Sequence, residues 1–118
     1  MGFRDLAKRL KADSTDLDSE RLLHRFHDLG LVPIGSISLR EPVRVGGEVK
    51  RIGVAPRQGV PSLEVVVSDG TGDAVAVFTG RRTIAGIEHG RGMVIEGVAR
   101  EERGRHIMLN PAYTLIGS

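Results

Sequence analysis

Arginine is the residue type in this chain with the clearest chemical use. The segment REERGR, residues 100–105, places Arg100, Arg103 and Arg105 within six positions and interrupts them with Glu101 and Glu102. A guanidinium can donate two parallel hydrogen bonds to one phosphate group and can also stack on a base. The cluster therefore predicts contact with a polyanion such as nucleic acid, while an ordinary solvent-facing charge cluster is the structural alternative.

Other basic residues and one aromatic residue extend this prediction. Arg57 lies in a segment that we interpret as a loop, and with the 100–105 cluster it is the strongest candidate for phosphate contacts. Base-aromatic stacking is worth ~1–3 kcal/mol per base, so Phe78 is a candidate platform if its ring is exposed; the alternative is that an N-terminal helix buries it. Tyr113 is more typical of a residue that closes a barrel. The candidate nucleic-acid-binding residues are Arg44, Lys50, Arg51, Arg57, Phe78, Arg81, Arg82, Arg100, Arg103 and Arg105.

Catalytic and metal chemistry find little support. His24 and His27 are three residues apart and could face one metal ion from a helix, but no third ligand shares that face and the chain contains no cysteine. Glu101 and Glu102 lie beside arginines, where a solvated charge cluster is a better interpretation than an acid/base pair. The G-x-G in Asp69-Gly-Thr-Gly72 lacks the third glycine and following helix of a dinucleotide site. We expect no enzyme activity, no metal and no cofactor.

Composition limits the chain to one compact domain with a short appendage. It has 118 residues, 40% of them hydrophobic, and a formal net charge of only +2. A charge this close to zero does not predict polyanion binding by itself, so the placement of the arginines must decide. The N-terminal segment is charged throughout and lacks the apolar run of a signal peptide, from which we expect a cytoplasmic protein.

The first third of the chain has the periodicity of helices. Residues 3–11 place apolar side chains at helical spacing, and residues 20–30 do the same between a polar cap and Gly30. A helix as short as the first is marginal alone and needs a surface to pack on. We expect residues 1–40 to form an N-terminal helical extension.

From Glu41 onward the apolar period becomes two, which predicts short strands. We expect them at residues 42–54, 62–69, 73–78, 93–101 and 105–116, with residues 55–61 as a loop and residues 79–92 as a helical turn or structured loop. The pair Gly46-Gly47 within the first strand indicates a bulge or sharp bend. Asp69-Gly-Thr-Gly72 predicts a tight hairpin between the second and third strands, because glycine permits positive φ.

A long bent first strand, a hairpin and a non-strand element before the fourth strand match a five-stranded OB-fold Greek-key barrel, which we expect over residues 41–118. The segments DGTGDAVAVF, EGVAREERGR and IMLNPAY resemble, in order and spacing, the OB-fold wedge domain of the RecG branch-migration helicase and the wider nucleic-acid-binding OB family. The resemblance covers roughly residues 42–115. No Walker A sequence is present, so it implies a free-standing module similar to small OB-fold proteins of high-GC bacteria, without an ATP-driven motor.

Two hypotheses follow from the sequence. The first is a non-enzymatic module that binds single-stranded or branched DNA, or RNA, through arginine-phosphate contacts of low sequence specificity. The second is a protein-interaction module, including a homodimer, in which the barrel is a scaffold and a helix or an open sheet edge docks on a partner. One continuous basic face would favour the first, and scattered arginines with an apolar groove the second.

Overall fold

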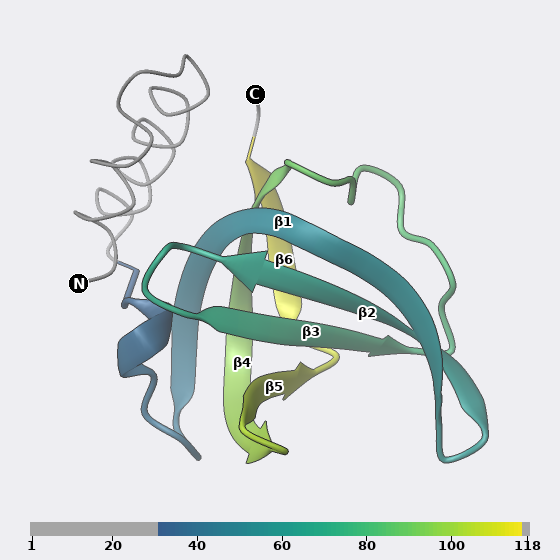
Figure 1. The fold of residues 1–118 in the computed structure, drawn as a ribbon, viewed down its shortest axis with the longest axis horizontal. Coiled ribbons are helices and arrows are strands. Elements are labelled where there is room, and N and C mark those ends of the chain that lie inside the picture. The colour runs from purple at the N-terminus through teal and green to yellow at the C-terminus, as the bar shows by residue number, and fades with distance from the viewer. Residues whose placement is uncertain (1–30, 117–118) are drawn as a thin grey trace.

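The computed structural model describes residues 31–116, which form a short 3-10 helix and six strands in a closed sheet (Figure 1). The elements are η1 (Ile34–Ser36), β1 (Pro42–Arg57), β2 (Val60–Ser68), β3 (Asp73–Thr79), β4 (Gly92–Glu102), β5 (Arg105–Leu109) and β6 (Ala112–Ile116). Within this range no helix has the length and hydropathy needed to cross a membrane.

The strand order is β1-β2-β3-β5-β4-β6, and a further pairing of β1 with β4 closes the sheet. All neighbouring strands are antiparallel except β3 and β5, which pair in parallel. This arrangement confirms a mainly β barrel of the OB type. The helices predicted over residues 3–11 and 20–30 lie outside the described residues.

The bend predicted at the glycine pair of β1 is confirmed. β1 pairs with β4 over residues 42–48 and with β2 over residues 48–57, with a register shift between Val49 and Arg51. Gly47 lies at the crossing, where a Cβ atom would overlap the backbone carbonyl of Ser68. Only glycine lets the two strands approach so closely, so one long strand can serve both halves of the barrel (Figure 1).

The loop predicted over residues 55–61 is mostly strand. β1 and β2 continue as a two-stranded arm to a two-residue turn at Gln58 and Gly59, which have φ values of 53° and 77°. Two consecutive positive φ values are typical of the tight turn that fits the twist of a hairpin. Pro56 and Pro61 lie opposite each other in the arm, where a proline without an N–H is tolerated at a sheet edge.

The single last strand predicted over residues 105–116 is two strands. Pro111 cannot donate to the ladder, and Asn110 adopts a φ of 48°. The Asn110 side chain instead accepts hydrogen bonds from the backbone N–H of Thr79 at 3.0 Å and from its hydroxyl at 3.2 Å. The break redirects the chain, so that β5 pairs with the second half of β4 and β6 with the first half.

The predicted hairpin at Asp69-Gly-Thr-Gly72 is confirmed, and it also holds the segment that leads into the barrel. Asp69 is only 8% exposed, and its carboxylate accepts hydrogen bonds from the Ile34 N–H at 2.9 Å and the Thr71 N–H at 2.8 Å. The Thr71 hydroxyl donates to the same carboxylate at 2.6 Å and accepts from the Gly35 N–H at 3.0 Å. Ile34 thereby inserts into the core with no exposed surface, although the sequence assigned it to the extension.

The barrel interior is filled by the inward-facing side chains of all the strands together with Ile34, Ile84 and Ile87. The last two belong to the connection between β3 and β4, which is a structured loop rather than a helical turn. Backbone hydrogen bonds join this loop to the bend of β1, from the Gly90 N–H to the Val49 carbonyl at 2.8 Å and from the Val49 N–H to the Arg91 carbonyl at 2.9 Å. The loop therefore caps one opening of the barrel.

Candidate nucleic-acid interface

Several of the basic candidate residues lie around the outer face of β2, β3 and β5. Strand registers place Arg51 opposite Val66, Val66 opposite Val75, and Val75 opposite Ile107. Ile107 in turn lies opposite Arg100 of β4. Since residues directly opposite each other point to the same side of a sheet, one row crosses the face from arginine through three apolar residues to arginine.

The floor of this outer face is apolar and closely packed. Val75, Val77 and Ile107 form a cluster separate from the barrel interior, with exposed fractions of 2%, 0% and 0%, and Val66 packs against them. β3 is therefore buried on both sides, since Ala74, Ala76 and Phe78 lie in the interior. A strand buried on both faces is rigid, so the face is a firm base for the charged residues around it.

A pocket of about 430 Å³ opens at one end of the outer face. The bend of β1 contributes Lys50 and Arg51, and β5 contributes Arg105, so three cationic side chains surround it. Asp73 is the one carboxylate among the lining residues, and Lys50 pairs with the carboxylate of the neighbouring Glu48 at 3.4 Å. Three cations against two carboxylates leave the pocket with a small excess of positive charge. Its lining consists of Lys50, Arg51, Val66, Asp73, Val75, Gly104, Arg105 and His106.

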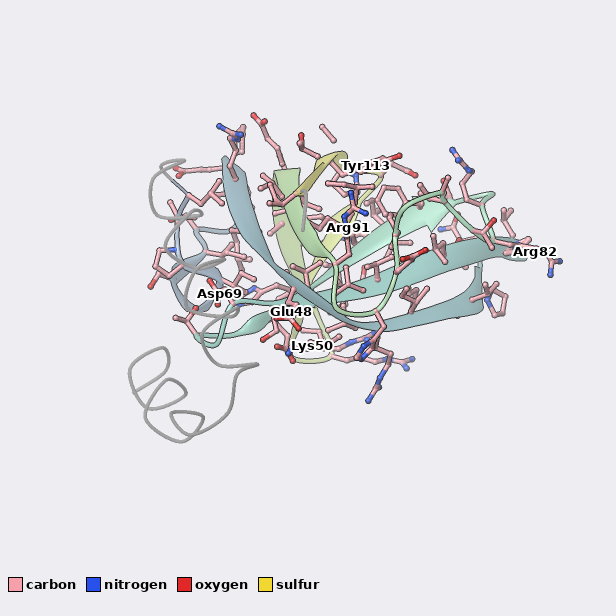
Figure 2. The ribbon with its side chains drawn as sticks, turned by 90° about the horizontal axis from the view of Figure 1, so that it is seen from above. Glu48, Lys50, Asp69, Arg82, Arg91 and Tyr113 are labelled. Carbon is pink, nitrogen blue, oxygen red and sulfur yellow. The ribbon has the colours of Figure 1, made fainter. Side chains whose placement is uncertain are left out.

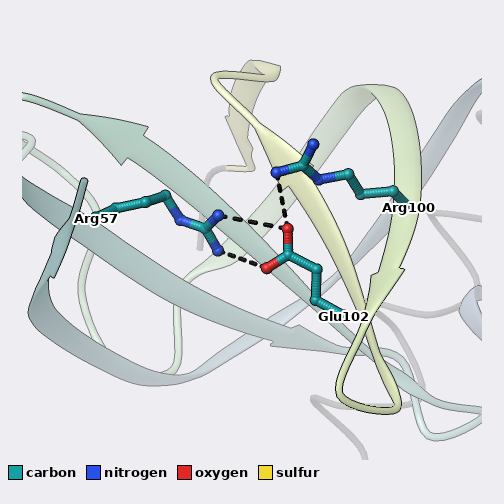
Figure 3. Close-up of polar contacts among 3 residues, drawn as sticks. All are labelled: Arg57, Arg100 and Glu102. Carbon is teal, nitrogen blue, oxygen red and sulfur yellow. Dashed lines mark hydrogen bonds and ion pairs between the residues drawn. The ribbon is translucent and has the colours of Figure 1, made fainter.

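A second charged cluster joins the two hairpins that flank the face (Figure 3). Arg57, at the end of β1, donates to the two carboxylate oxygens of Glu102 at 2.8 and 3.4 Å. Arg100 approaches the same carboxylate at 2.7 Å from β4. We call Arg57, Glu102 and Arg100 the arginine-glutamate bridge.

The bridge changes the ionisation of its members. The hydrogen bonds donated by Arg57 lower the pKa of the Glu102 carboxyl, and the charges of Arg57 and Arg100 act in the same direction. The same hydrogen bonds raise the pKa of Arg57. Glu102 is therefore ionised at neutral pH and neutralises one of the two guanidinium charges.

The prediction that Phe78 could be an exposed platform for a base is wrong, because the ring is buried. Phe78 is 6% exposed and belongs to the interior cluster, so no base can reach its ring. The reason is its register, since Phe78 pairs with Leu63 on the inward side of β2. Tyr113 packs against it edge to face, with ring centroids 5.6 Å apart, and keeps 41% of its surface exposed.

The remaining basic candidates do not line the pocket. Arg44 pairs with Glu96 at 3.5 Å where β1 meets β4. Arg81 and Arg82 are exposed in the loop after β3, and Figure 2 shows Arg82 at the opposite end of the molecule from Asp69. Arg103 is exposed in the turn between β4 and β5. The structure thus brings Lys50, Arg51 and Arg105 together at the pocket and joins Arg57 to Arg100 through Glu102.

Sequence reasoning missed two features of the face. Glu102 was interpreted only as part of a solvated charge cluster, because its contact with Arg57 spans 45 positions of the chain. Asp73 and the floor residues Val66 and Val75 were assigned to strands without a ligand role. The period of two in residues 62–68 places Val66 on the face opposite Leu63, Val65 and Val67. It does not identify the residues of other strands that lie beside Val66, because strand registers are not visible in one sequence.

The described residues contain no candidate metal site. Across residues 31–116, no group of three or more His, Cys, Asp or Glu side chains gathers closely enough to hold an ion. The predicted pair His24 and His27 lies outside those residues. The charged groups that are described can bind an anion through hydrogen bonds and Coulomb attraction.

Comparison with known proteins supports the fold. Neither a protein-family model nor a curated protein sequence matches the chain. Among solved structures, a chain in the structure of a replication protein A heterotrimer bound to ssDNA is similar, with a TM-score of 0.51 and 14% identity. The match covers 72% of this chain and 64% of that one, which is less than two thirds of the neighbour's length. At this identity the likeness shows the OB-like fold, and the ligand must be argued from the site.

Proposed function

We propose that this chain is a non-enzymatic module that binds nucleic acid across the outer face of its barrel, with low sequence specificity. The observation that carries the proposal is the pocket at which Lys50, Arg51 and Arg105 surround an apolar floor. Phosphates would contact these three side chains, while a sugar lies over Val66, the floor residue that is partly exposed. The likeness of the barrel to a chain from a structure that contains single-stranded DNA supports the same class of ligand.

The composition of the face indicates modest, salt-sensitive affinity. Both aromatic residues of the described chain, Phe78 and Tyr113, lie at the barrel interior or its opening, so stacking contributes little on this face. Three phosphate contacts to a single strand predict that log Kobs falls with log salt concentration with a slope of roughly −2. Asp73 weakens the attraction further, and together these effects favour binding without sequence readout.

Fluorescence anisotropy tests the proposal with labelled single-stranded DNA, single-stranded RNA and a forked DNA duplex. Each is measured at about 50 and about 200 mM salt, a range over which the dependence of log Kobs on salt can be determined. The forked duplex is included because the sequence resembles the RecG wedge domain. We expect saturable binding to at least one of these ligands, with weaker binding at the higher salt concentration.

A matched pair of variants locates the interface. The triple variant Lys50→Gln/Arg51→Gln/Arg105→Gln removes the three cations of the pocket, and Arg44→Gln/Arg81→Gln/Arg82→Gln removes the same charge elsewhere. We expect the first to lose at least about tenfold in affinity and the second less than about threefold, because short-range phosphate contacts exceed the effect of net charge. Equal losses in both, or no binding by the unchanged chain at tens of micromolar, would overturn the proposal.

The protein-interaction hypothesis has one observation in its favour. Ile52 and Val54 are 39% and 48% exposed on the side of the β1–β2 arm that is opposite Arg51. Exposed apolar side chains on an extended hairpin are typical of an association surface. Sedimentation over a concentration series tests whether a second copy of the chain is the partner. The double variant Ile52→Ser/Val54→Ser should abolish any dimer. A monomer at every concentration would reject self-association.

A further inference from the structure

The arginine-glutamate bridge has the composition of an occupied anion site. Two guanidinium groups from different strands converge on one carboxylate, with the shortest contacts at 2.8 Å from Arg57 and 2.7 Å from Arg100. Arg57 contacts both oxygens, so the carboxylate is held in a forked geometry (Figure 3). A phosphodiester carries the same single negative charge and also presents two oxygens, so it can take the same place between the arginines.

The bridge lies beside the pocket already described. Glu102 is directly opposite Arg105 in the register of β4 and β5, and Arg105 lines the pocket. Arg100 is two residues before Glu102 on β4 and ends the row that crosses the outer face. A strand with one phosphate in the pocket would therefore pass the bridge as it continues across the face.

The carboxylate is accessible enough to be exchanged. The side chains of Glu102 and Arg100 are 31% and 53% exposed, and that of Arg57 is 23% exposed. Ion pairs at this exposure are weak in water because solvent competes for both partners. After release, Glu102 can hydrate at the tip of its hairpin, and no buried charge is left unpaired.

We propose that Arg57 and Arg100 form a second phosphate-binding site, that Glu102 occupies this site as an internal substitute for phosphate, and that a phosphodiester of the bound strand displaces it. This inference rests on the proposed function, since the displacing group belongs to the nucleic acid held at the pocket. Glu102 then lowers the affinity for nucleic acid, because each nucleic-acid strand must compete with a carboxylate that is always present at high local concentration.

The test compares Glu102→Gln with Glu101→Gln. Both variants remove one negative charge from the same hairpin, but Glu101 is exposed and points to the other side of β4. Glutamine keeps the shape of the side chain and an oxygen that can accept from Arg57, so the fold should be retained, as thermal unfolding can check. The probe is the oligonucleotide that binds the unchanged chain most tightly, measured by anisotropy at several salt concentrations.

We expect Glu102→Gln to bind about two- to fivefold more tightly at low salt than the unchanged chain, as an exposed ion pair of ordinary strength would imply. Its salt slope should differ from that of the unchanged chain by less than about 0.7, the contribution of one phosphate contact on a single strand, because a phosphodiester fills the second site in both proteins. Glu101→Gln should change the affinity by less than about half of this gain. Adding Arg57→Gln to Glu102→Gln should remove the gain.

The possible results separate this inference from the proposed function. If the unchanged chain binds through the pocket, and Glu102→Gln and Glu101→Gln gain equally or not at all, the second site is rejected and the pocket remains. If neither the unchanged chain nor Glu102→Gln binds any probe, both proposals are rejected. If only Glu102→Gln binds, the second site is supported and the pocket alone is insufficient.

Discussion

Two hairpins of this barrel each use a carboxylate to hold a distant segment, and they do so under opposite conditions. At the turn between β2 and β3, Asp69 is 8% exposed and accepts the backbone N–H of Ile34. At the turn between β4 and β5, the side chain of Glu102 is 31% exposed and contacts the side chains of Arg57 and Arg100. A buried carboxylate bonded to backbone has no substitute when it is lost, whereas a solvated one bonded to arginines can be replaced by water or another anion.

The difference explains why acidic residues in similar hairpins have different consequences. Asp69 fixes how the chain enters the barrel, so it belongs to the stability of the fold. Glu102 controls the charge of a surface that we propose for ligand binding. Burial and partner type, rather than the carboxylate itself, separate the two roles.

The largest effect is expected from Asp69→Ala. It leaves the buried Ile34 N–H without an acceptor and removes both hydrogen bonds from Thr71, so the free energy of unfolding should fall by about 2–4 kcal/mol. Denaturant unfolding measures the loss. Asp73→Ala, at an exposed position, should change it by less than about 0.5 kcal/mol. Equal stability of the two variants would show that the Asp69 contacts do not contribute to the free energy of unfolding.

A smaller loss is expected from Gly35→Ala, which attacks the same contact from the other side. The added Cβ would lie 2.6 Å from the Thr71 carbonyl oxygen, so η1 must move away from the hairpin. Overpacking of this kind costs about 1–3 kcal/mol. Gly53→Ala is the control, because its Cβ would meet nothing within 4 Å. The measurement is again denaturant unfolding, and a loss in Gly53→Ala as large as that in Gly35→Ala would contradict the close approach.

The contribution of the arginine-glutamate bridge to stability should depend on pH, which tests the role assigned to Glu102. The hydrogen bonds from Arg57 lower the pKa of Glu102 in the folded state, so the bridge stabilises the fold fully above the ordinary glutamate pKa of about 4.3. This contribution is lost as the pH falls through the lowered pKa. NMR titration of the Glu102 carboxyl should show the depressed value, and Arg57→Gln should raise it toward normal. An unchanged pKa in Arg57→Gln would disprove the assigned cause.

The smallest effect is expected from salt. Raising the salt concentration to about 1 M shortens the Debye length to about 3 Å and should weaken the contacts of Glu102 with Arg57 and Arg100. Hydrogen exchange of the Ile34 amide should stay as slow as before, because its acceptor is buried. Side-chain NMR of the arginines follows the first change. Faster exchange at Ile34 in high salt would indicate that the Asp69 contact is also a surface interaction.

The fold could be predicted further than the site. Alternating valines together with Gly46, Gly47, Gly70 and Gly72 contain enough information for five strands, the bend and the hairpin. The continuous arm at 55–61 was missed because its residues, which include Pro56, Gly59 and Pro61, are typical of a loop. The break at Asn110-Pro111 was missed because residues typical of strands lie on both sides of it.

The site depended on contacts that one sequence does not contain. Composition identified the arginines, but the partner of Arg57 is 45 positions away and only closure of the barrel brings it near. Phe78 was misplaced because both faces of β3 are buried, and alternation cannot identify the interior of a strand whose two sides are both apolar. The three cations at the pocket come from β1 and β5, which meet only through the strands between them.

The parallel pairing of β3 with β5 has a consequence for how the chain folds. β1, β2 and β3 can pair in sequence as a meander while the chain emerges during synthesis, but the edge of β3 stays open until residues 105–109 are available. Unpaired strand edges template association with other chains, and late, non-local pairing slows folding. The nascent barrel is thus most exposed to aggregation between completion of β3 and arrival of β5, and chaperone binding should concentrate in that interval.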